Sequence, residues 1–562
     1  MNGLLIIDGV RLFSAAPTED IFPDTCPPDI PAVCPPAVLH TARGGREGIQ
    51  IGVQAGDRPL TGLTARCTPA IPGVTAEVFS IELLPFSQNT IHIGSRSVRA
   101  AAPGVLPEVL RPQPVDVPAG ECRALYLRVS AAPDAVPGEY PATVTVTADG
   151  FSAALPILSV VHCAVLPAPE RSRFSYVCWT QLLEPEHLRR VYGIRPWSPE
   201  HETLLKNCGR IMRAQRQNVI DVPLEHVLAD GLSVDADGTL RFDLTHLDRF
   251  LAIMRDPDGM GARSFSGMHL LSRDWSLDMP PATSWSQRGL IGWVFERQPD
   301  GHFERVWKPA ADPAVEEFHR TLFSALGAHL RAIGLEGAWL QHVADEIDSD
   351  IQYQQTLAVY RLIHELMPGA RTIDAVRRES PYTFGRELDI HVPLLWHHAH
   401  APQAYRAIPD GRAEVWQYTC LQPQFDYLSR LGDYPLAATR LLGWYNFLAG
   451  LTGYLHYAWN NYGPCVHRHD PYADVSCFGS FPCDAFIVYP DREGLSVFES
   501  LRSEAMRGAL EDYELLCLAA QIAPQAVCAA AQVAVAAADE HTNDADFLFA
   551  LREQLLCLID TH

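Results

Sequence analysis

The sequence predicts a multidomain α and β protein: an N-terminal β-sandwich, a (β/α)8 TIM barrel and a helical C-terminal tail. Short apolar runs broken by Pro and Gly fill the first part of the chain. Segments with strand patterns then alternate with segments with helical patterns, and the end of the chain has helical patterns only. At 562 residues the chain is too long for one compact core. We therefore expect a sandwich over 1–168, a barrel over 169–520 and a helical extension over 521–562.

Antiparallel strands are expected in the first domain. The run T-V-T-V-T at 143–147 alternates in polarity, Asp149 and Gly150 follow it, and an apolar run resumes at 151–161. An Asp-Gly pair between two such runs is typical of a β-hairpin. Repeated short strands with turn residues between them predict a β-sandwich. Two prolines within 166–170 then indicate a linker between domains.

Parallel strands that alternate with helices are expected in the middle domain. An apolar stripe at helical spacing over 315–333 marks one of the helices. Eight strands with intervening helices in about 300 residues match the count of a (β/α)8 barrel. The expected strands are 174–180, 218–222, 265–271, 337–345, 371–376, 388–396, 414–419 and 453–460.

Helices are expected throughout the last part of the chain. Amphipathic patterns cover 500–520 and 546–560, and the Ala-rich segment 526–538 is also expected to be helical.

Charge and cysteine content limit the possible partners and compartment. The balance of 44 basic and 67 acidic residues gives a net charge of -23, which repels phosphate backbones, so we expect no nucleic-acid partner. The 14 cysteines form no C-x-x-C pair, which favours a reducing compartment. No stretch approaches the ~20 apolar residues of a membrane span. We expect a cytoplasmic protein with no membrane partner, and the sequence leaves the oligomeric state open.

Two neighbouring carboxylates, Asp345 and Glu346, follow the apolar run that begins at Gly337. If that run is a barrel strand, the acids lie at its C-terminal end, where the catalytic groups of such barrels gather. Both can reach one pocket only where the strand is ending, because neighbours in a regular strand point to opposite faces. The alternative is an acidic loop in which Asp348 or Ser349 caps the next helix.

Aromatic and polar side chains are expected at the ends of the other strands. Aromatic platforms and polar donors suit a sugar, whose ring has apolar faces and a polar rim. Each of these aromatic residues taken alone is more often a packing residue, and their coincidence at strand ends favours a binding site. The candidate substrate-binding residues are Trp179, His269, Trp396, His397, Tyr418, Trp459, Asn460 and Asp484.

Four segments of the second half resemble one known family of catalytic domains. They are V-W-Q-Y-T-C at 415–420, G-Y-L-H-Y-A-W-N-N at 453–461, D-A-F-I-V-Y-P-D at 484–491 and S-L-R-S-E-A-M-R-G-A-L-E-D-Y-E-L-L at 500–516. The family is glycoside hydrolase family 123, with its relatives in domain of unknown function 4091. P-G-E-Y-P-A-T-V-T-V at 137–146 is similar to the β-sandwich that precedes the barrel in that group.

The resemblance implies an exo-acting, retaining β-N-acetylgalactosaminidase with substrate-assisted catalysis, acting on a carbohydrate with a terminal 2-acetamido sugar. It implies that Glu346 is the general acid and then the base, and that Asp345 holds the acetamido N–H while the acetamide oxygen attacks C1. Two close carboxylates resist ionising together, so one keeps a proton. The chain departs from the family pattern at Ile347, Tyr457 and Cys483, which concerns the choice of sugar.

The sequence also leaves other interpretations open. The cluster of Cys and His residues over 465–483 matches no zinc pattern, so we expect a solvated loop there, no metal and no cofactor. A same-fold glycosidase could instead pair Glu346 with a more distant acid, Asp374 or Asp484. A noncatalytic carbohydrate-binding protein is the third possibility.

Overall fold

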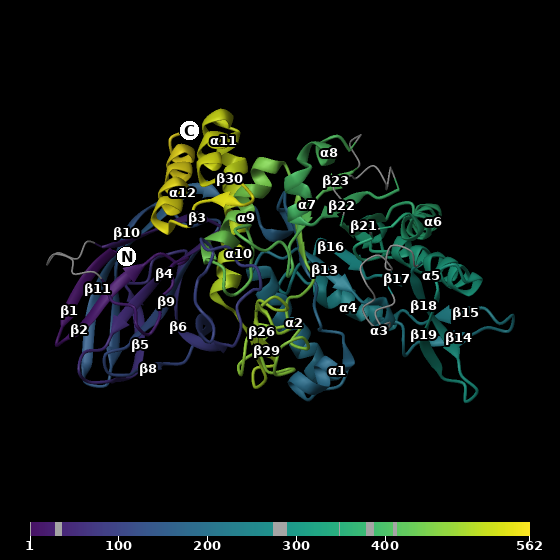
Figure 1. Ribbon diagram of the computed structural model, residues 1–562, viewed down its shortest axis with the longest axis horizontal. Coiled ribbons are helices and arrows are strands. Elements are labelled where there is room, and N and C mark those ends of the chain that lie inside the picture. The colour runs from purple at the N-terminus through teal and green to yellow at the C-terminus, as the bar shows by residue number, and fades with distance from the viewer. Residues whose placement is uncertain (1, 28–35, 274–288, 348, 378–386, 409–412) are drawn as a thin grey trace. The chain divides into compact units, whose positions relative to one another are not determined.

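The computed structural model describes residues 2–27, 36–273, 289–347, 349–377, 387–408 and 413–562 (Figure 1). Its contacts divide the chain into two compact units. The first unit consists of Met1–Phe174, Pro423–Gly450 and Asn460–His562, and the second of Ser175–Gln422 and Leu451–Trp459. Each unit is described by itself below.

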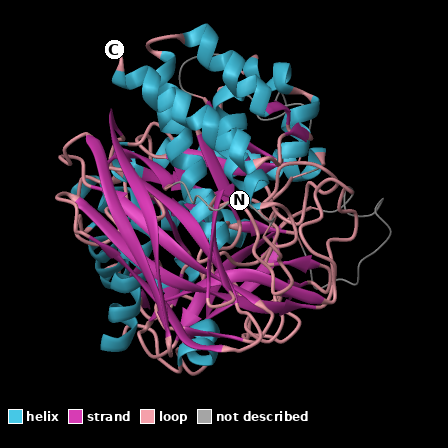
Figure 2. Cartoon of the chain, turned by 90° about the vertical axis from the view of Figure 1, so that its left-hand side faces the viewer, coloured by secondary structure: helices cyan, strands magenta, loops and turns pink. Residues whose placement is uncertain are grey.

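Two large sheets build the first unit, and their strands are the long magenta arrows of Figure 2. All strand pairs are antiparallel except the parallel pair β3–β11. The six-stranded sheet has the order β1 (Asn2–Ile7), β2 (Val10–Ala15), β4 (Arg46–Gln54), β9 (Cys122–Ala131), β6 (Val74–Phe86) and β7 (Gly104–Arg111). The five-stranded sheet has the order β3 (Ala37–Arg43), β11 (Phe151–Val165), β10 (Gly138–Ala148), β5 (Leu60–Thr68) and β8 (Val115–Val117).

One hydrophobic core joins these two sheets. Along β10 and β11, buried residues alternate with more exposed ones, as expected for strands with one face on a core. In contrast, β4 and β9 are buried along most of their length. The core includes Leu12, Val53 and Leu127 of the first sheet and Leu39, Val144 and Ile157 of the second. The expected hairpin is confirmed: Ala148 pairs with Phe151, and Gly150 has a φ of +70°, which suits the turn between them.

Helices complete the first unit, and buried ion pairs join three of them to one another and to β4. Arg440 of α9 (Leu436–Ala449) lies 2.8 Å from Glu47 of β4 and 2.8 Å from Asp512 of α10 (Leu501–Ala520). Arg552 of α12 (Ala545–Asp560) pairs with the same Asp512 at 2.9 Å. Arg440, Asp512 and Arg552 are all buried. Because these charges need partners inside the protein, α9 and α10 group with the N-terminal sheets rather than with 169–520, where the sequence placed them.

The helical expectation for the end of the chain holds over most of its length. The apolar patterns over 500–520 and 546–560 correspond to α10 and α12. The segment 526–538 is only partly helical, because α11 (Pro524–Ala534) ends where β30 (Val535–Ala537) begins to pair with β31 (Glu540–His541). Over the described residues, every helix falls short of the length and apolar character that a bilayer span requires.

Parallel strands build the second unit, and helices separate most of them along the chain. One sheet has the order β13 (Val219–Val222), β16 (Ser264–Gly267), β20 (Trp339–Gln341), β21 (Arg371–Val376), β22 (Ile390–Pro393) and β23 (Glu414–Val415). The other has the order β12 (Ser175–Cys178), β25 (Gly453–His456) and β24 (Gln417–Tyr418). A single core cluster takes Val177, Val219, Leu340, Ile373, Ile390, Trp416 and Leu455 from both sheets.

The helices of the second unit follow the expected pattern of a strand and then a helix. The stripe over 315–333 is confirmed as α5, which buries Phe318, Leu322, Leu326 and Leu330. A three-stranded antiparallel sheet of β17 (Leu271–Ser272), β18 (Ile291–Arg297) and β19 (Phe303–Pro309) precedes it. The main helices are α2 (Pro199–Ala214), α4 (Thr245–Arg255), α5 (Pro313–Ala332), α6 (Asp350–Leu366), α7 (Leu395–His400) and α8 (Pro402–Arg406).

Most expected strands are shorter than the sequence indicated: 174–180 gives β12, 265–271 gives β16, and 414–419 is divided between β23 and β24, which lie in different sheets. Three more are shortened as well. The run 337–345 gives only β20, since a 3-10 turn covers Glu336–Ala338 and residues after Gln341 leave the ladder. The run 388–396 gives β22, because a helix starts two residues after Pro393. The run 453–460 gives β25, which ends at His456. In each of the runs 337–345, 388–396 and 453–460, the apolar sequence pattern continues past the end of the strand because the residues that follow are also buried.

Candidate active site

The acid pair lies just beyond the end of β20. Asp345 and Glu346 form a half-buried bend after three fully buried residues. Glu346 has a φ of +49°, in the left-handed region that residues other than glycine seldom adopt. Because successive side chains of a strand point to opposite faces, two adjacent carboxylates can face the same side only where the backbone departs from strand geometry, as it does at Glu346. Unusual backbone conformations of this kind are concentrated at functional sites.

Two side chains from neighbouring strands hold Glu346. Tyr418, the last residue of β24, donates its phenolic hydrogen to Oε1 at 2.5 Å. Arg377, the residue that follows β21, donates from Nη1 to Oε2 at 3.4 Å. Hydrogen bonds to an ionised group are stronger than those between neutral groups. Both carboxylate oxygens of Glu346 are therefore fixed in orientation by donors from two other strands.

Asp345 is the member of the pair with the perturbed acidity. Burial raises the pKa of Asp345 to about 7, and the negative charge of Glu346 raises it further, against the opposing effect of Arg273. Near neutral pH the pair therefore holds one proton readily. Sequence reasoning expected one acid of the pair to keep a proton, and assigned it to Glu346.

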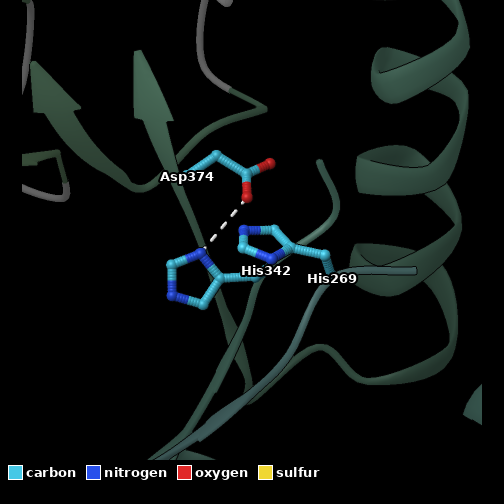
Figure 3. Close-up of side chains that lie close together, drawn as sticks. All are labelled: His269, His342 and Asp374. Atoms are coloured by element: carbon cyan, nitrogen blue, oxygen red, sulfur yellow. Dashed lines mark hydrogen bonds and ion pairs between the residues drawn. The ribbon is translucent and has the colours of Figure 1, made fainter. Parts of the chain in front are cut away.

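A second carboxylate, Asp374 on β21, supports the backbone of the bend. Its Oδ1 accepts the N–H of Val343 at 3.0 Å, and its Oδ2 accepts the N–H of Ala344 at 3.1 Å. The hydroxyl of Tyr360 on α6 also donates to Oδ2. His342 Nδ1 lies 3.3 Å from Oδ1, as the dashed line in Figure 3 shows. Burial raises the pKa of Asp374 to about 7, and the hydrogen bonds oppose that rise.

Three rings gather beside Asp374. Trp179, which follows β12, meets the rings of His269 and His342 edge-on, with centroids 5.0 and 5.3 Å away. Burial lowers the pKa of each histidine to about 3, so both are neutral. Trp179 Nε1 and the Nε2 atoms of both histidines have no hydrogen-bond partner among the described residues. Because an unpaired buried polar atom is costly, these three atoms are suited to the hydroxyl or amide groups of a ligand.

A metal ion could be held only by the group drawn in Figure 3 among the residues that the structure describes. The ligand atoms of His269, His342 and Asp374 lie within 4.8 Å of one another. Both oxygens of Asp374 already accept backbone N–H groups, which accounts for its burial without a cation. The geometry favours a hydrogen-bonded group.

The cysteine and histidine cluster over 465–483 belongs to the first unit and is only partly solvated. Cys465, Cys477 and Cys483 are buried, with the Sγ atoms of the first two 3.8 Å apart, whereas His467 is exposed. The expectation of a solvated loop is wrong for these cysteines, because free thiols pack as small apolar groups.

The expected substrate-binding residues do not all lie at strand ends. Tyr418 contacts the acid pair, and Trp179 and His269 lie together beside Asp374. Trp396 and His397 are on α7, since β22 ends at Pro393; Trp396 is exposed and stacks its ring near His400. Trp459 is fully buried and donates to Gln215 at 2.9 Å. Asn460 and Asp484 are buried residues of the first unit.

Sequence reasoning missed His342, Tyr360 and Arg377. His342 stands within the run that ends in the acid pair, so it could have been selected as a polar residue near the end of an expected strand. Arg377 follows an expected strand directly, which makes it a strand-end residue of the kind selected elsewhere. Tyr360 lies in the middle of α6, and its contact with Asp374 depends on helix packing that no local pattern reveals.

The comparison with protein families decides the class of this site. The model described as glycoside hydrolase 123, catalytic domain, matches residues 182–519, which is more than half of the chain. The chain belongs to glycoside hydrolase family 123. The resemblance noted in the sequence is thereby confirmed, and so is the prediction of a glycoside-hydrolysing enzyme.

One solved structure agrees with the assignment to family 123 at the level of the fold. A family 123 glycoside hydrolase from Clostridium perfringens, solved in a study of glycolipid glycan hydrolysis, has a TM-score of 0.73 at 15% identity, covering 98% of each chain. A family 10 xylanase with a bacterial Ig-like domain, from termite gut, has a TM-score of 0.33 at 11% identity, covering 69% of this chain and 90% of the xylanase. The search of curated proteins found no match.

Proposed function

We propose that this family 123 enzyme is an exo-acting, retaining hydrolase that releases terminal β-linked N-acetylgalactosamine by substrate-assisted catalysis. The observation that carries the proposal is the bend at Asp345 and Glu346, where two adjacent carboxylates follow a parallel strand and Glu346 takes a left-handed conformation. A neighbouring acid pair supports a mechanism in which the substrate's own acetamide is the nucleophile. The fold that the proposal assumes is a (β/α)8 barrel preceded by a β-sandwich.

Each acid has a separate role in the proposed reaction. Glu346 protonates the glycosidic oxygen as the acetamide oxygen attacks C1, and then takes a proton from the water that opens the oxazolinium ring. Asp345 accepts the acetamido N–H and stabilises the positive charge that develops on that group. The positive charge that develops on the acetamido group beside Asp345 favours the ionised form of Asp345. The reaction therefore draws the proton that the pair shares away from Asp345.

The rings beside Asp374 support recognition of a sugar. Trp179 presents a free indole N–H, and neutral His342, which donates from Nδ1 to Asp374, keeps Nε2 as an acceptor. A sugar hydroxyl can accept from the first and donate to the second. The required partner is a carbohydrate with a terminal 2-acetamido sugar, and no cofactor enters the scheme. The glycan of a glycolipid is a candidate, because hydrolysis of such glycans is the subject of the Clostridium perfringens study.

The rival with a conventional carboxylate pair requires a second acid that is free to act. Asp374 is a poor candidate, since both of its oxygens already accept backbone N–H groups. A retaining enzyme of that type needs carboxyl groups about 5 Å apart on either side of the bond, and adjacent residues of one bend do not provide this arrangement. We also propose a cytoplasmic location, which the free thiols of the described cysteines support.

A panel of aryl β-glycosides tests the proposal. The 2-acetamido galactoside should be cleaved, while the 2-hydroxy galactoside should be turned over very poorly even where it binds, because its nucleophile is missing. A thiazoline mimic of the bicyclic intermediate should inhibit strongly. Equal turnover of the two galactosides without thiazoline inhibition would reject substrate assistance, and cleavage of none of the glycosides would favour a noncatalytic binding protein.

A further inference from the structure

The segment between β20 and the acid pair has an unusual hydrogen-bond arrangement. β20 pairs with β21 at Leu340 and Gln341 and then leaves the ladder. The next N–H groups that face β21, those of Val343 and Ala344, donate to the side chain of Asp374 instead of to a backbone carbonyl. Pairing with β21 resumes only beyond the acids, in the isolated bridge between Ile347 and Val376.

One carboxylate therefore accepts two consecutive backbone N–H groups directly before the bend that carries the acid pair. Buried backbone N–H groups require a partner, and Asp374 supplies it while keeping the two strands apart at this point. Tyr360 and His342 hold the carboxylate from the other sides. The side chain of Asp374 is fully buried, so water cannot substitute for it.

We propose that Asp374 is a positioning residue that fixes the peptides of Val343 and Ala344 and, through them, the orientation of Asp345 and Glu346. The inference rests on the proposed function for its kinetic consequence. Asp374 makes no hydrogen bond to either acid, so its effect on the reaction passes through the backbone and through its charge.

The charge of Asp374 provides a readout that a merely structural residue would not change. The groups that face it are His269 and His342 on the strand ends, Tyr360 on α6 and Asp345 on the bend. After the larger effects of burial, Glu346 and Arg273, the charge of Asp374 raises the pKa of Asp345. Removing that charge lowers the pKa of Asp345. If the reaction requires ionised Asp345, the acid limb of the plot of kcat against pH then moves to lower pH.

The test compares Asp374→Asn with Asp389→Asn. Asp389 is also a buried carboxylate, which accepts the N–H of Thr372 at 2.9 Å and binds His364 at 3.1 Å, but it precedes β22, at the opposite end of the strands from the acid pair. We expect Asp374→Asn to lower kcat about 10²-fold while KM changes less than about threefold, as for a displaced catalytic group. Its acid limb should move to lower pH. Asp389→Asn should lower the melting temperature and leave both kcat and the acid limb of its pH dependence unchanged.

Amide hydrogen exchange of Val343 and Ala344 completes the test without any substrate. Exchange at both residues should be at least about tenfold faster in Asp374→Asn than in the wild type. Unchanged exchange, an acid limb that stays in place or a kcat within threefold of wild type would each overturn the proposal. If Asp374→Asn does not fold, Tyr360→Phe removes one donor to the carboxylate and should speed the same exchange. Failure of the galactosaminide to react would reject the proposed function alone. Hydrogen exchange is measured in the free protein, and the kinetics can be measured on any glycoside that the enzyme cleaves.

Discussion

Tyr418 donates its phenolic hydrogen to Glu346 Oε1 at 2.5 Å, which links the end of β24 to the acid that follows β20. These strands are not neighbours in either sheet, so the bond connects the two parallel sheets of the second unit at the site of reaction. Tyr418→Phe should lower kcat about tenfold with little change in KM, because a charge-assisted hydrogen bond contributes about 1.5–3 kcal/mol.

Tyr434→Phe is the matched control for Tyr418→Phe. Tyr434 is equally buried, and its hydroxyl donates to the carbonyl of Phe425 at 2.8 Å within the first unit. It should cost stability and leave kcat unchanged. A loss of kcat of the same size in both variants would mean that Tyr418 matters only for folding.

Glu346→Gln should remove the proton donor and lower the rate about 10²- to 10⁴-fold for substrates with poor leaving groups. Activated aryl leaving groups need less protonation, so their loss should be smaller. Rates measured over a series of aryl leaving groups check this. Because the raised pKa belongs to Asp345 in the free protein, the same series with Asp345→Asn is the control, and a stronger leaving-group dependence in that variant would exchange the roles of the two acids.

Asp345→Asn keeps the shape of the side chain and loses its charge. Turnover should fall more than substrate affinity, because the charge acts on the developing oxazolinium rather than on the bound sugar. Separate values of kcat and KM on the 2-acetamido substrate check the result. Turnover equal to that of the wild type would remove Asp345 from the mechanism.

The same variant predicts a pH dependence of stability. Asp345 has a raised pKa in the folded protein, about 7 against an ordinary value of 3.8, so the folded state holds its proton more tightly than the unfolded state. The wild type therefore loses stability from this group as pH rises from about 4 to about 7. Asparagine does not titrate, so the difference in melting temperature between Asp345→Asn and the wild type should grow over that interval and then stay constant. A difference that is the same at pH 4 and pH 8 would contradict the burial of Asp345.

Chelator treatment should leave activity and melting temperature unchanged. Asp374 is held by His342 and by two backbone N–H groups, and the cysteines of 465–483 pack as thiols. Dialysis against a chelator, followed by measurement of bound metal, checks this prediction. Loss of activity that zinc restores would show that the histidine pair is a metal site after all.

Local patterns predicted the strands best where one face is buried and a turn residue ends the run. The hairpin at Gly150, the strand 371–376 and the stripe of α5 were readable for this reason. The same patterns extended β20 and β22 too far, because buried residues after a strand are as apolar as those within it. The acid pair was found from its place after an apolar run. Arg377, which holds Glu346, was within reach of the same reasoning because it directly follows the strand 371–376. The contact of Tyr360 with Asp374 was not, since it depends on helix packing.

The buried ion pairs of the first unit also set an order on its synthesis. Glu47 emerges from the ribosome early, whereas its partner Arg440, and the Asp512 and Arg552 that complete the group, come from far later in the chain. All of the second unit up to Gln422 is made in between. A buried charge without its partner is strongly unfavourable, so the early strands cannot reach their final packing while the nascent chain is still short. The enzyme must therefore complete its N-terminal part last, after translation has passed the acid pair.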